Sequence, residues 1–367
     1  YIFFEAMLIP LFLIIGIWGG DNRVYATIKF FIYTLVGSVL MLISLIYLSM
    51  QTSSFFIYDF YGLDLPLSVQ IYLFVAFLIA FGIKIPMWPV HTWLPDAHVQ
   101  APSSGSVILA AVLLKVGGYG MIRFLLPITP DAGFYLNDIV VTLSLVAIIY
   151  ISFVALAQKD MKKLIAYSSI AHMGFVTLGI FLTFNALSEE IIFNREMILI
   201  GLQGAVMQMI SHGLISAGLF ICIGIIYTRT KSREINEQSG IGQVMPVFSA
   251  LMMFFLISNS GLPGTSGFVG EFMVLVSSLE VSIVYGLLAS TTLVLAASYS
   301  LWLGKRVLFG EVSSETIKKM PNLKTNEFWP LFILILMIIV IGVQPNIILD
   351  LSHSASNNLI NSLVGSP

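Results

Sequence analysis

The sequence predicts an all-α, polytopic transmembrane helical bundle. Of its 367 residues, 58% are hydrophobic and only 10% are charged, whereas a soluble domain carries about 25% charged residues. The apolar residues form continuous runs of roughly 20, the length that crosses a hydrocarbon core of about 30 Å. Because these runs are long and do not alternate, membrane strands are excluded. A soluble enzyme, a nucleic-acid-binding protein and a disordered regulator are excluded on the same grounds.

About ten apolar segments are expected to cross the membrane. The basic residues of the connecting loops fall almost entirely in the odd-numbered loops, and only Arg123 and Arg195 fall in the even-numbered ones. By the positive-inside rule, the odd loops face the cytoplasm or the mitochondrial matrix. The expected spans are residues 2–18, 28–49, 67–90, 103–126, 137–157, 163–184, 197–227, 245–278, 282–308 and 328–349.

The chain begins inside its first apolar run, at Tyr1-Ile2-Phe3-Phe4-Glu5, without a methionine. No short apolar segment with a basic flank and a cleavage site precedes it, so a signal peptide is not predicted. We expect this start to be the interior of a longer protein or the product of a split one.

Lys84 is one of two lysines that lie inside the expected spans and are not counted with the loops at their ends. It precedes Pro86 and Pro89, which remove backbone donors and should break this helix. A broken helix at membrane depth is tolerated where it lines a wet cavity. A charge at this depth usually carries function; the alternative is a lysine that extends its ammonium to the membrane surface.

Lys115 is the second lysine within a span, and it lies more than ten residues from the start of its helix. Gly117, Gly118 and Gly120 follow it and should allow close packing or water access. Burial disfavours the charged form of a lysine, so its proton can be released by a small electrostatic change. A static buried ion pair is the alternative interpretation.

Glu271 follows a second predicted break, a glycine- and proline-rich stretch at residues 259–270. Five helices separate Lys84 from Glu271, and an odd number inverts the topology. The two sites are therefore predicted to belong to inverted five-helix repeats, the plan of many transporters, with the pathway at the broken helices. The alternative is a purely structural turn.

Three further titratable residues fall within spans. Glu5 needs a partner, and Lys84 is the expected one; exposure at a frayed chain end is the alternative. His172 has Ser168 one helical turn earlier, and His212 has Gln208 in the same relation. Histidines with such neighbours suit a hydrated proton path, although buried structural histidines remain equally compatible with the pattern.

The loop after Lys84 carries His91, Asp96 and His98 but no lysine or arginine. A proton entrance is one interpretation of this loop, and a network of turn and capping contacts is the other. Elsewhere, the single cysteine, Cys222, lies in an apolar run, which excludes a disulfide framework and a cysteine-ligated metal cluster. The chain has no nucleotide-binding glycine motif, and no histidine has a second ligand at metal-binding spacing. Therefore no metal, NADH, flavin or iron–sulfur site is predicted on it.

Three segments resemble the antiporter-like subunits of respiratory complex I, the NADH:quinone oxidoreductase. They are Gly82-Ile83-Lys84-Ile85-Pro86 through Asp96-Ala97-His98 and Ala101-Pro102, the run Leu114-Lys115-Val116-Gly117-Gly118-Tyr119-Gly120, and Gly261-Leu262-Pro263 through Gly270-Glu271-Phe272. The resemblance covers essentially the whole chain. It implies a proton-translocating subunit with about fourteen helices in its full form, so that roughly four N-terminal helices are absent here.

The resemblance also assigns roles. Glu5 and Lys84 match a modulating ion pair, Lys115 the central proton carrier, Glu271 the terminal carrier, and His172 and His212 the histidines between them. Separation of the pair would drive a proton from Lys115 through the histidines and water to Glu271. FMN, iron–sulfur clusters, NADH and quinone would lie on other subunits of the complex, and the partners would be neighbouring membrane subunits and the lipid of a bacterial or mitochondrial inner membrane.

We expect residues 1–130 to form an incomplete first repeat, 131–310 the second repeat, and 311–367 a loop and a C-terminal transmembrane helix. Two alternatives stay open at this point. One is a subunit of a multisubunit sodium/proton antiporter, which shares the fold and the long motif; the other is a truncated structural fragment that does not pump.

Overall fold

A computed structural model describes residues 1–187 and 195–364. The described residues form helices joined by short loops, and no β-strand occurs among them. Eight of these helical segments are long and apolar enough to cross a membrane, and the segments Ile2–Trp18 and Pro246–Asn259 are shorter apolar helices. The all-α prediction is therefore confirmed.

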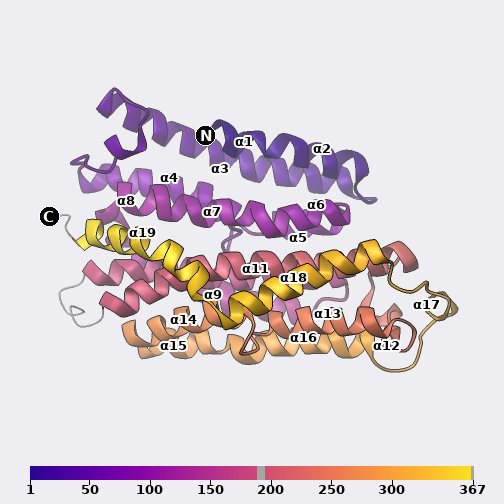
Figure 1. Ribbon diagram of the computed structural model, residues 1–367. Coiled ribbons are helices and arrows are strands. Elements are labelled where there is room, and N and C mark those ends of the chain that lie inside the picture. The colour runs from indigo at the N-terminus through magenta and orange to yellow at the C-terminus, as the bar shows by residue number, and fades with distance from the viewer. Residues whose placement is uncertain (188–194, 365–367) are drawn as a thin grey trace.

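The N-terminal part of the bundle, indigo to magenta in Figure 1, contains the first break. Helix α4 ends at Lys84, as the prolines predict, and α5 begins at Trp93. The Trp93 indole donates to the Ile83 carbonyl at 2.9 Å, so a backbone group freed by the break has a partner. The helices of this part are α1 (Ile2–Ala6), α2 (Leu8–Trp18), α3 (Arg23–Thr52), α4 (Leu67–Lys84) and α5 (Trp93–Gln100).

The helix that carries Lys115 is continuous but irregular. It consists of α6 (Ser103–Ile108), α7 (Leu114–Gly120) and α8 (Leu126–Ile128), joined by π-helical turns at Leu109–Leu113 and Met121–Leu125. Such turns leave some carbonyls without their usual helical partner and often occur at functional sites. A Cβ on Gly117 would lie 2.7 Å from the Phe81 carbonyl oxygen and from the Ile85 amide nitrogen, so glycine is what lets α7 pack against the end of α4.

The middle of the bundle consists of α9 (Pro130–Leu156), α10 (Met161–Phe181) and α11 (Arg195–Thr230). Helices α10 and α11 approach closely, since a Cβ on Gly179 would lie 2.7 Å from the Gly201 carbonyl oxygen. Small residues of this kind allow membrane helices to pack through their backbones. Almost every residue of α10 is buried, which places this helix in the centre of the molecule.

The second break separates α13 (Pro246–Asn259) from α14 (Ser266–Val281). Gly261 and Gly264 have φ of +77° and +91°, in the left-handed region that favours glycine. Figure 1 shows α13 and α14 end to end beside α15 (Ile283–Ser290) and α16 (Thr292–Leu308), and α18 (Thr325–Val343) and α19 (Asn346–Val364) crossing over α11. The short helices α12 (Ile241–Val244) and α17 (Glu315–Lys318) lie in loops.

The segment expected at 282–308 is present as Ile283–Leu308, with a turn between α15 and α16. Two details of the predicted spans need correction. The segment expected at 328–349 ends at Val343. Helix α19 follows it and was not predicted, because its polar residues lower the hydropathy. Lys162, counted with the loop charges, is the second residue of α10 and is 2% exposed.

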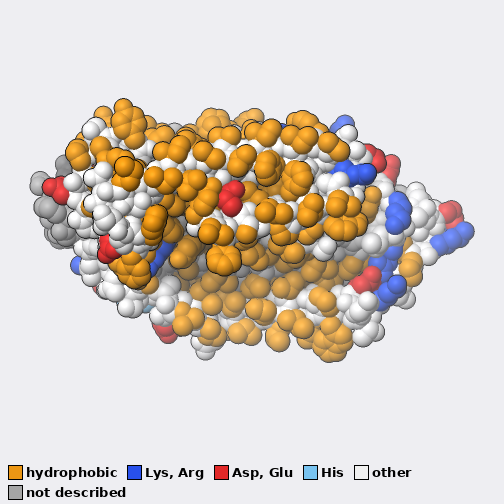
Figure 2. Space-filling view, turned by 90° about the horizontal axis from the view of Figure 1, so that it is seen from above, with side chains coloured by type: hydrophobic (Ala, Val, Ile, Leu, Met, Phe, Trp, Pro, Cys, Tyr) orange, Lys and Arg blue, Asp and Glu red, His pale blue; other side chains and the backbone are white. Residues whose placement is uncertain are grey.

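The surface separates apolar sides from a charged end. The helix-to-helix loops that carry α12 and α17 lie at one end of the molecule, opposite the C-terminus (Figure 1). In Figure 2, hydrophobic side chains cover most of the visible face, and basic side chains gather toward the end at the right of the view. This distribution agrees with the predicted concentration of basic residues in the odd-numbered loops.

Candidate functional site

Lys115 and His212 are in direct contact. The Lys115 Nζ lies 2.7 Å from the His212 Nδ1 and donates to the Ala110 carbonyl at 2.6 Å. Ala110 belongs to the π-helical turn before α7, so the irregularity of this helix supplies the acceptor. A Cβ on Gly213 would lie 3.0 Å from the Ala111 carbonyl oxygen; glycine at that position lets α11 bring His212 to the lysine. One proton can therefore be shared between an amine and an imidazole.

His172 and Glu271 form a second contact on the other side of His212. The His172 Nδ1 lies 2.5 Å from the Glu271 Oε1, and both residues are buried. The Gln208 amide donates to the same carboxylate oxygen at 2.8 Å, and the Tyr299 hydroxyl lies 3.0 Å from the His172 Nε2. Every polar atom of the imidazole therefore has a partner, which fixes the orientation of the ring.

The two contacts meet at the histidines. The ring centroids of His172 and His212 are 5.9 Å apart, a separation that one water molecule can bridge. Lys115, His212, His172 and Glu271, which we call the polar line, thus run from α7 through α11 and α10 to α14. The structure brings together four of the six membrane residues that the sequence singled out, which come from four helices distant in the sequence.

Ser168 and Gln208 lie one helical turn before the two histidines, as expected, but their side chains bond to other groups. Ser168 donates to the Ile165 carbonyl at 2.9 Å instead of contacting His172, and Gln208 bonds to Glu271 instead of His212. Hydroxyl groups on helices often bond to their own backbone, so spacing alone does not assign their partner. Tyr299 was missed because a tyrosine within an apolar helix has no distinguishing sequence signal.

Lys84 and Glu5 lie near each other without forming an ion pair. Lys84 is 1% exposed, which excludes the interpretation that its ammonium reaches the membrane surface. The ammonium lies 3.4 Å from the Phe4 carbonyl oxygen and 4.2 Å from the centroid of the Phe4 ring. The charge of Glu5 acts on Lys84, but the Glu5 Oε1 is buried without a hydrogen-bond partner among the described residues. Neither residue contacts the polar line directly.

The three titratable residues after the first break lie in two environments. His91 belongs to the loop between α4 and α5, whereas Asp96 and His98, which were expected in that loop, belong to α5. Asp96 forms an ion pair of 2.7 Å with Lys29 of α3, which supports the predicted network of structural contacts. His91 is 7% exposed and His98 is fully buried. Burial lowers the pKa of His91 to about 4 and lowers the pKa of His98 well below its ordinary value, so both imidazoles are neutral.

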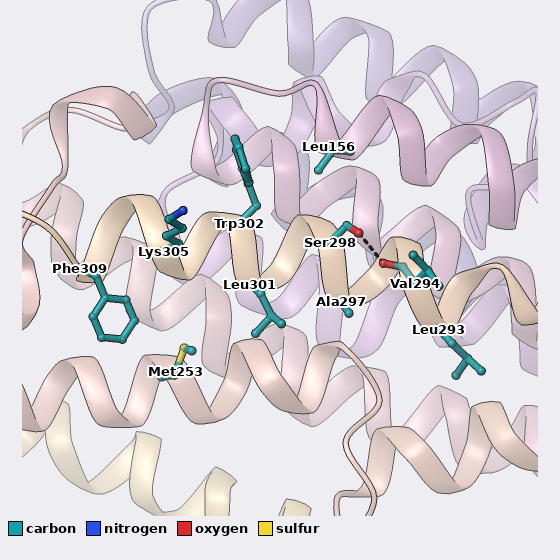
Figure 3. A pocket seen from close by; sticks show the side chains of 10 residues that line it. All are labelled: Leu156, Met253, Leu293, Val294, Ala297, Ser298, Leu301, Trp302, Lys305 and Phe309. Carbon is teal, nitrogen blue, oxygen red and sulfur yellow. Dashed lines mark hydrogen bonds between the residues drawn. The ribbon is translucent and has the colours of Figure 1, made fainter.

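The described part of the chain contains no group of three or more histidine, cysteine, aspartate or glutamate side chains that could hold a metal ion. A large groove, of about 1050 Å³, lies outside the polar line, along α16 (Figure 3). Its lining is almost entirely apolar, with Trp302 and Lys305 on one side and Leu301 and Phe309 on the other. None of the residues of the polar line lies among those that line it.

A membrane helical bundle with two broken helices and a buried line of titratable side chains defines a class, the polytopic proteins that move ions across membranes. The chain belongs to the NADH:quinone oxidoreductase/Mrp antiporter transmembrane family, whose model matches residues 1–296. It is 48% identical to the NADH-quinone oxidoreductase subunit M of Rhodobacter capsulatus over 99% of this chain and 70% of that protein. It is 44% identical to the NADH-ubiquinone oxidoreductase chain 4 of Chondrus crispus, over 98% and 70% respectively.

A solved structure agrees with these relatives. Respiratory complex I from Thermus thermophilus with bound NADH contains a chain that superposes with a TM-score of 0.90 at 30% identity. The superposition covers all of this chain and 75% of that one. The fold class expected from the sequence resemblance is therefore confirmed.

Proposed function

We propose that this chain is the proton-translocating subunit M of the membrane arm of an NADH:quinone oxidoreductase, in a bacterial inner membrane or a mitochondrial inner membrane. Its relatives carry the names of that subunit, and its fold is that of a complex I chain. Within the complex, its partners are the neighbouring membrane subunits and the lipid bilayer. We place FMN, iron–sulfur clusters, NADH and quinone on other subunits, so that this chain couples to electron transfer without a redox centre of its own.

The polar line is the observation that carries the proposal. In the loaded state, the Lys115 ammonium donates to the His212 Nδ1 across 2.7 Å. When the lysine gives up this proton, an N–H bond forms at the His212 Nδ1. A proton leaves the other ring nitrogen of His212 and forms an N–H bond at the His172 Nε2, the nitrogen that does not face Glu271. His172 then delivers a proton from Nδ1 to the Glu271 carboxylate across 2.5 Å. Each step exchanges one N–H bond for another, or for an O–H bond at Glu271, without any redox change.

Tyr299 and Gln208 hold the receiving end of the line. Tyr299 bonds to the His172 nitrogen that does not face Glu271, so it sets which nitrogen carries hydrogen before transfer. Gln208 donates to the Glu271 Oε1, the oxygen that faces His172, and stabilises the carboxylate before it receives a proton. These two residues are positioning residues of the proposed path.

Lys84 supplies the switch in this proposal. Its charge is buried and has only a distant carboxylate, Glu5, to balance it. A movement of α1 that changes the distance from Glu5 to Lys84 therefore changes the electrostatic potential near the first break. Because α7 packs against the end of α4 at Gly117, that change reaches the helix that carries Lys115.

The test measures protons moved per NADH oxidised in membrane vesicles that contain the assembled complex. Lys115→Ala should lower this ratio, because the central carrier is lost. Lys159→Ala, which removes an exposed loop lysine, should leave the ratio unchanged. A Lys115→Ala complex with an unchanged ratio contradicts the proposal, and sodium-driven proton transport without NADH oxidation would instead identify a sodium/proton antiporter.

A further inference from the structure

Lys162 is a buried cation that the proposed path does not use. It is 2% exposed, although it lies at the basic end of the molecule, next to the loop between α9 and α10. It is the second residue of α10, and a helix N-terminus disfavours a positive charge because its own backbone dipoles already point their positive ends there. A buried cation at a helix N-terminus is electrostatically unfavourable, which suggests that Lys162 has a functional role.

No carboxylate balances Lys162 directly. Its ammonium donates to the Ala101 carbonyl at 2.8 Å and to the Ser106 hydroxyl at 3.3 Å. The nearest acidic residue in sequence, Asp160, accepts from the Lys163 backbone amide at 3.0 Å and pairs with Arg233 at 3.4 Å. Among the described residues, Lys162 forms no ion pair. Neutral partners of this kind can hold either an ammonium or an amine.

His98 lies beside this lysine. Its ring stacks on Phe220 with centroids 4.4 Å apart, and both ring nitrogens are buried without hydrogen-bond partners among the described residues. The Ser106 hydroxyl, which accepts from Lys162, also donates to the His98 backbone carbonyl at 3.1 Å. The charges of both Lys162 and Lys115 act on His98, so this imidazole is near both lysines.

We propose that Lys162 is the proton-loading residue of the entrance, and that it supplies Lys115 through His98 and intervening water. A proton from the basic side binds the Lys162 amine. The lysine N–H bond then breaks as an N–H bond forms on His98, and the opposite ring nitrogen of His98 releases a proton toward the Lys115 amine. This inference rests on the proposed function and adds its entrance branch.

The chemistry of arginine separates this role from a structural one. Lys162→Arg keeps the positive charge and the donors but cannot release a proton, whereas Lys162→Met keeps most of the volume and removes the proton. If Lys162 loads protons, both variants should lower the rate of NADH-driven proton uptake by roughly tenfold or more. Lys163→Met is the matched control, because it removes the adjacent, more exposed lysine and should leave the rate unchanged.

The measurement uses vesicles with the assembled complex, in which the amount of this chain is determined alongside proton uptake. Full activity of either Lys162→Arg or Lys162→Met overturns the proposal. Full activity of Lys162→Arg would show that a permanent positive charge at this position is sufficient for proton uptake. If the methionine variant does not assemble, the arginine variant decides the question. A Lys115→Ala complex measured in parallel distinguishes failure of the entrance proposal from failure of the proposed function. If this complex pumps normally, the proposed function itself is contradicted.

The pH profile provides a readout that a structural role would not change. The charged and titratable groups near Lys162 are Asp160 and Arg233 beside the α10 N-terminus, and His98 on α5. Ser106→Ala removes one acceptor from the ammonium and leaves these groups in place. We expect it to displace the pH at which proton uptake is half-maximal, while an unchanged profile contradicts the role of Lys162 as the loading residue.

Discussion

The four titratable side chains of the polar line are joined in two pairs by short contacts, and their proposed roles follow from these partners. Lys115 and His212 share one contact, and His172 and Glu271 share another. The sequence identified all four, because an ionisable group within a long apolar run rarely has a purely structural role. It could not identify Tyr299 or assign Gln208 to Glu271, because these contacts join helices whose relative rotation is set by packing.

His91 provides a prediction at the residue scale. Burial lowers its pKa to about 4, whereas an unfolded histidine titrates near 6.5. The folded state therefore excludes a proton that the unfolded state binds. The stabilisation from the neutral imidazole is complete above about pH 6.5 and is lost as the pH falls toward 4, with a loss of roughly 2 kcal/mol at pH 5.

The measurement compares the thermal midpoint of the complex-bound chain at pH 7.5 and pH 5. His91→Gln cannot acquire this proton, so its midpoint should fall less than that of the wild type over the same interval. His353→Gln, at an exposed histidine of α19, should fall as much as the wild type. Equal falls for all three proteins would show that His91 is not the sensitive group.

At the scale of elements, the two broken helices were the most predictable features. Pro86 and Pro89 end α4, and the glycines of residues 259–270 separate α13 from α14. Both breaks follow from the backbone preferences of proline and glycine, which can be predicted from the local sequence alone. The π-helical turns around Lys115 and the amphipathic helix α19 were not predictable, since the first depends on packing and the second lacks a long apolar run.

Gly261→Ala should destabilise the second break. Its φ of +77° is unfavourable for any residue with a Cβ and costs about 1–2 kcal/mol. The added methyl would also lie 3.5 Å from the Glu271 Oε2, an ordinary contact that removes space for water beside the carboxylate. We expect a lower thermal midpoint together with slower proton uptake.

Gly62→Ala is the matched control, because a Cβ there meets nothing within 4 Å and its backbone is not in the left-handed region. It should change neither quantity. A Gly261→Ala complex as stable as the control would show that the break tolerates a side chain at this position.

At the scale of the whole molecule, charge determines orientation. The basic loops gather at one end of the bundle (Figure 2), and we predict that this end faces the cytoplasm or matrix. The division into repeats at residues 1–130, 131–310 and 311–367 stays a prediction. Hydropathy predicts the helices, but it contains no information on which of them pack together. Close contacts between helices, such as that of Gly179 with Gly201, determine the packing.

Cysteine labelling tests this orientation. The native Cys222 is fully buried, so the background should be low. Lys318→Cys, in α17, should react with a membrane-impermeant thiol reagent only from the basic side, and Gly62→Cys, in the loop before α4, only from the opposite side. Labelling of both positions from the same side would contradict the topology.

The polar line also has an electrical consequence. Lys115, His172 and His212 each lie near the middle of a membrane-spanning segment, and Glu271 follows a break in the middle of another, so the line runs from helix to helix at one depth. Moving a charge across the whole membrane costs about 2.3 kcal/mol per 100 mV, but a sideways step crosses almost none of that voltage. The work against the membrane potential is therefore done in the parts of the path before Lys115 and after Glu271. The proton transfers between these two residues depend little on the size of the membrane potential.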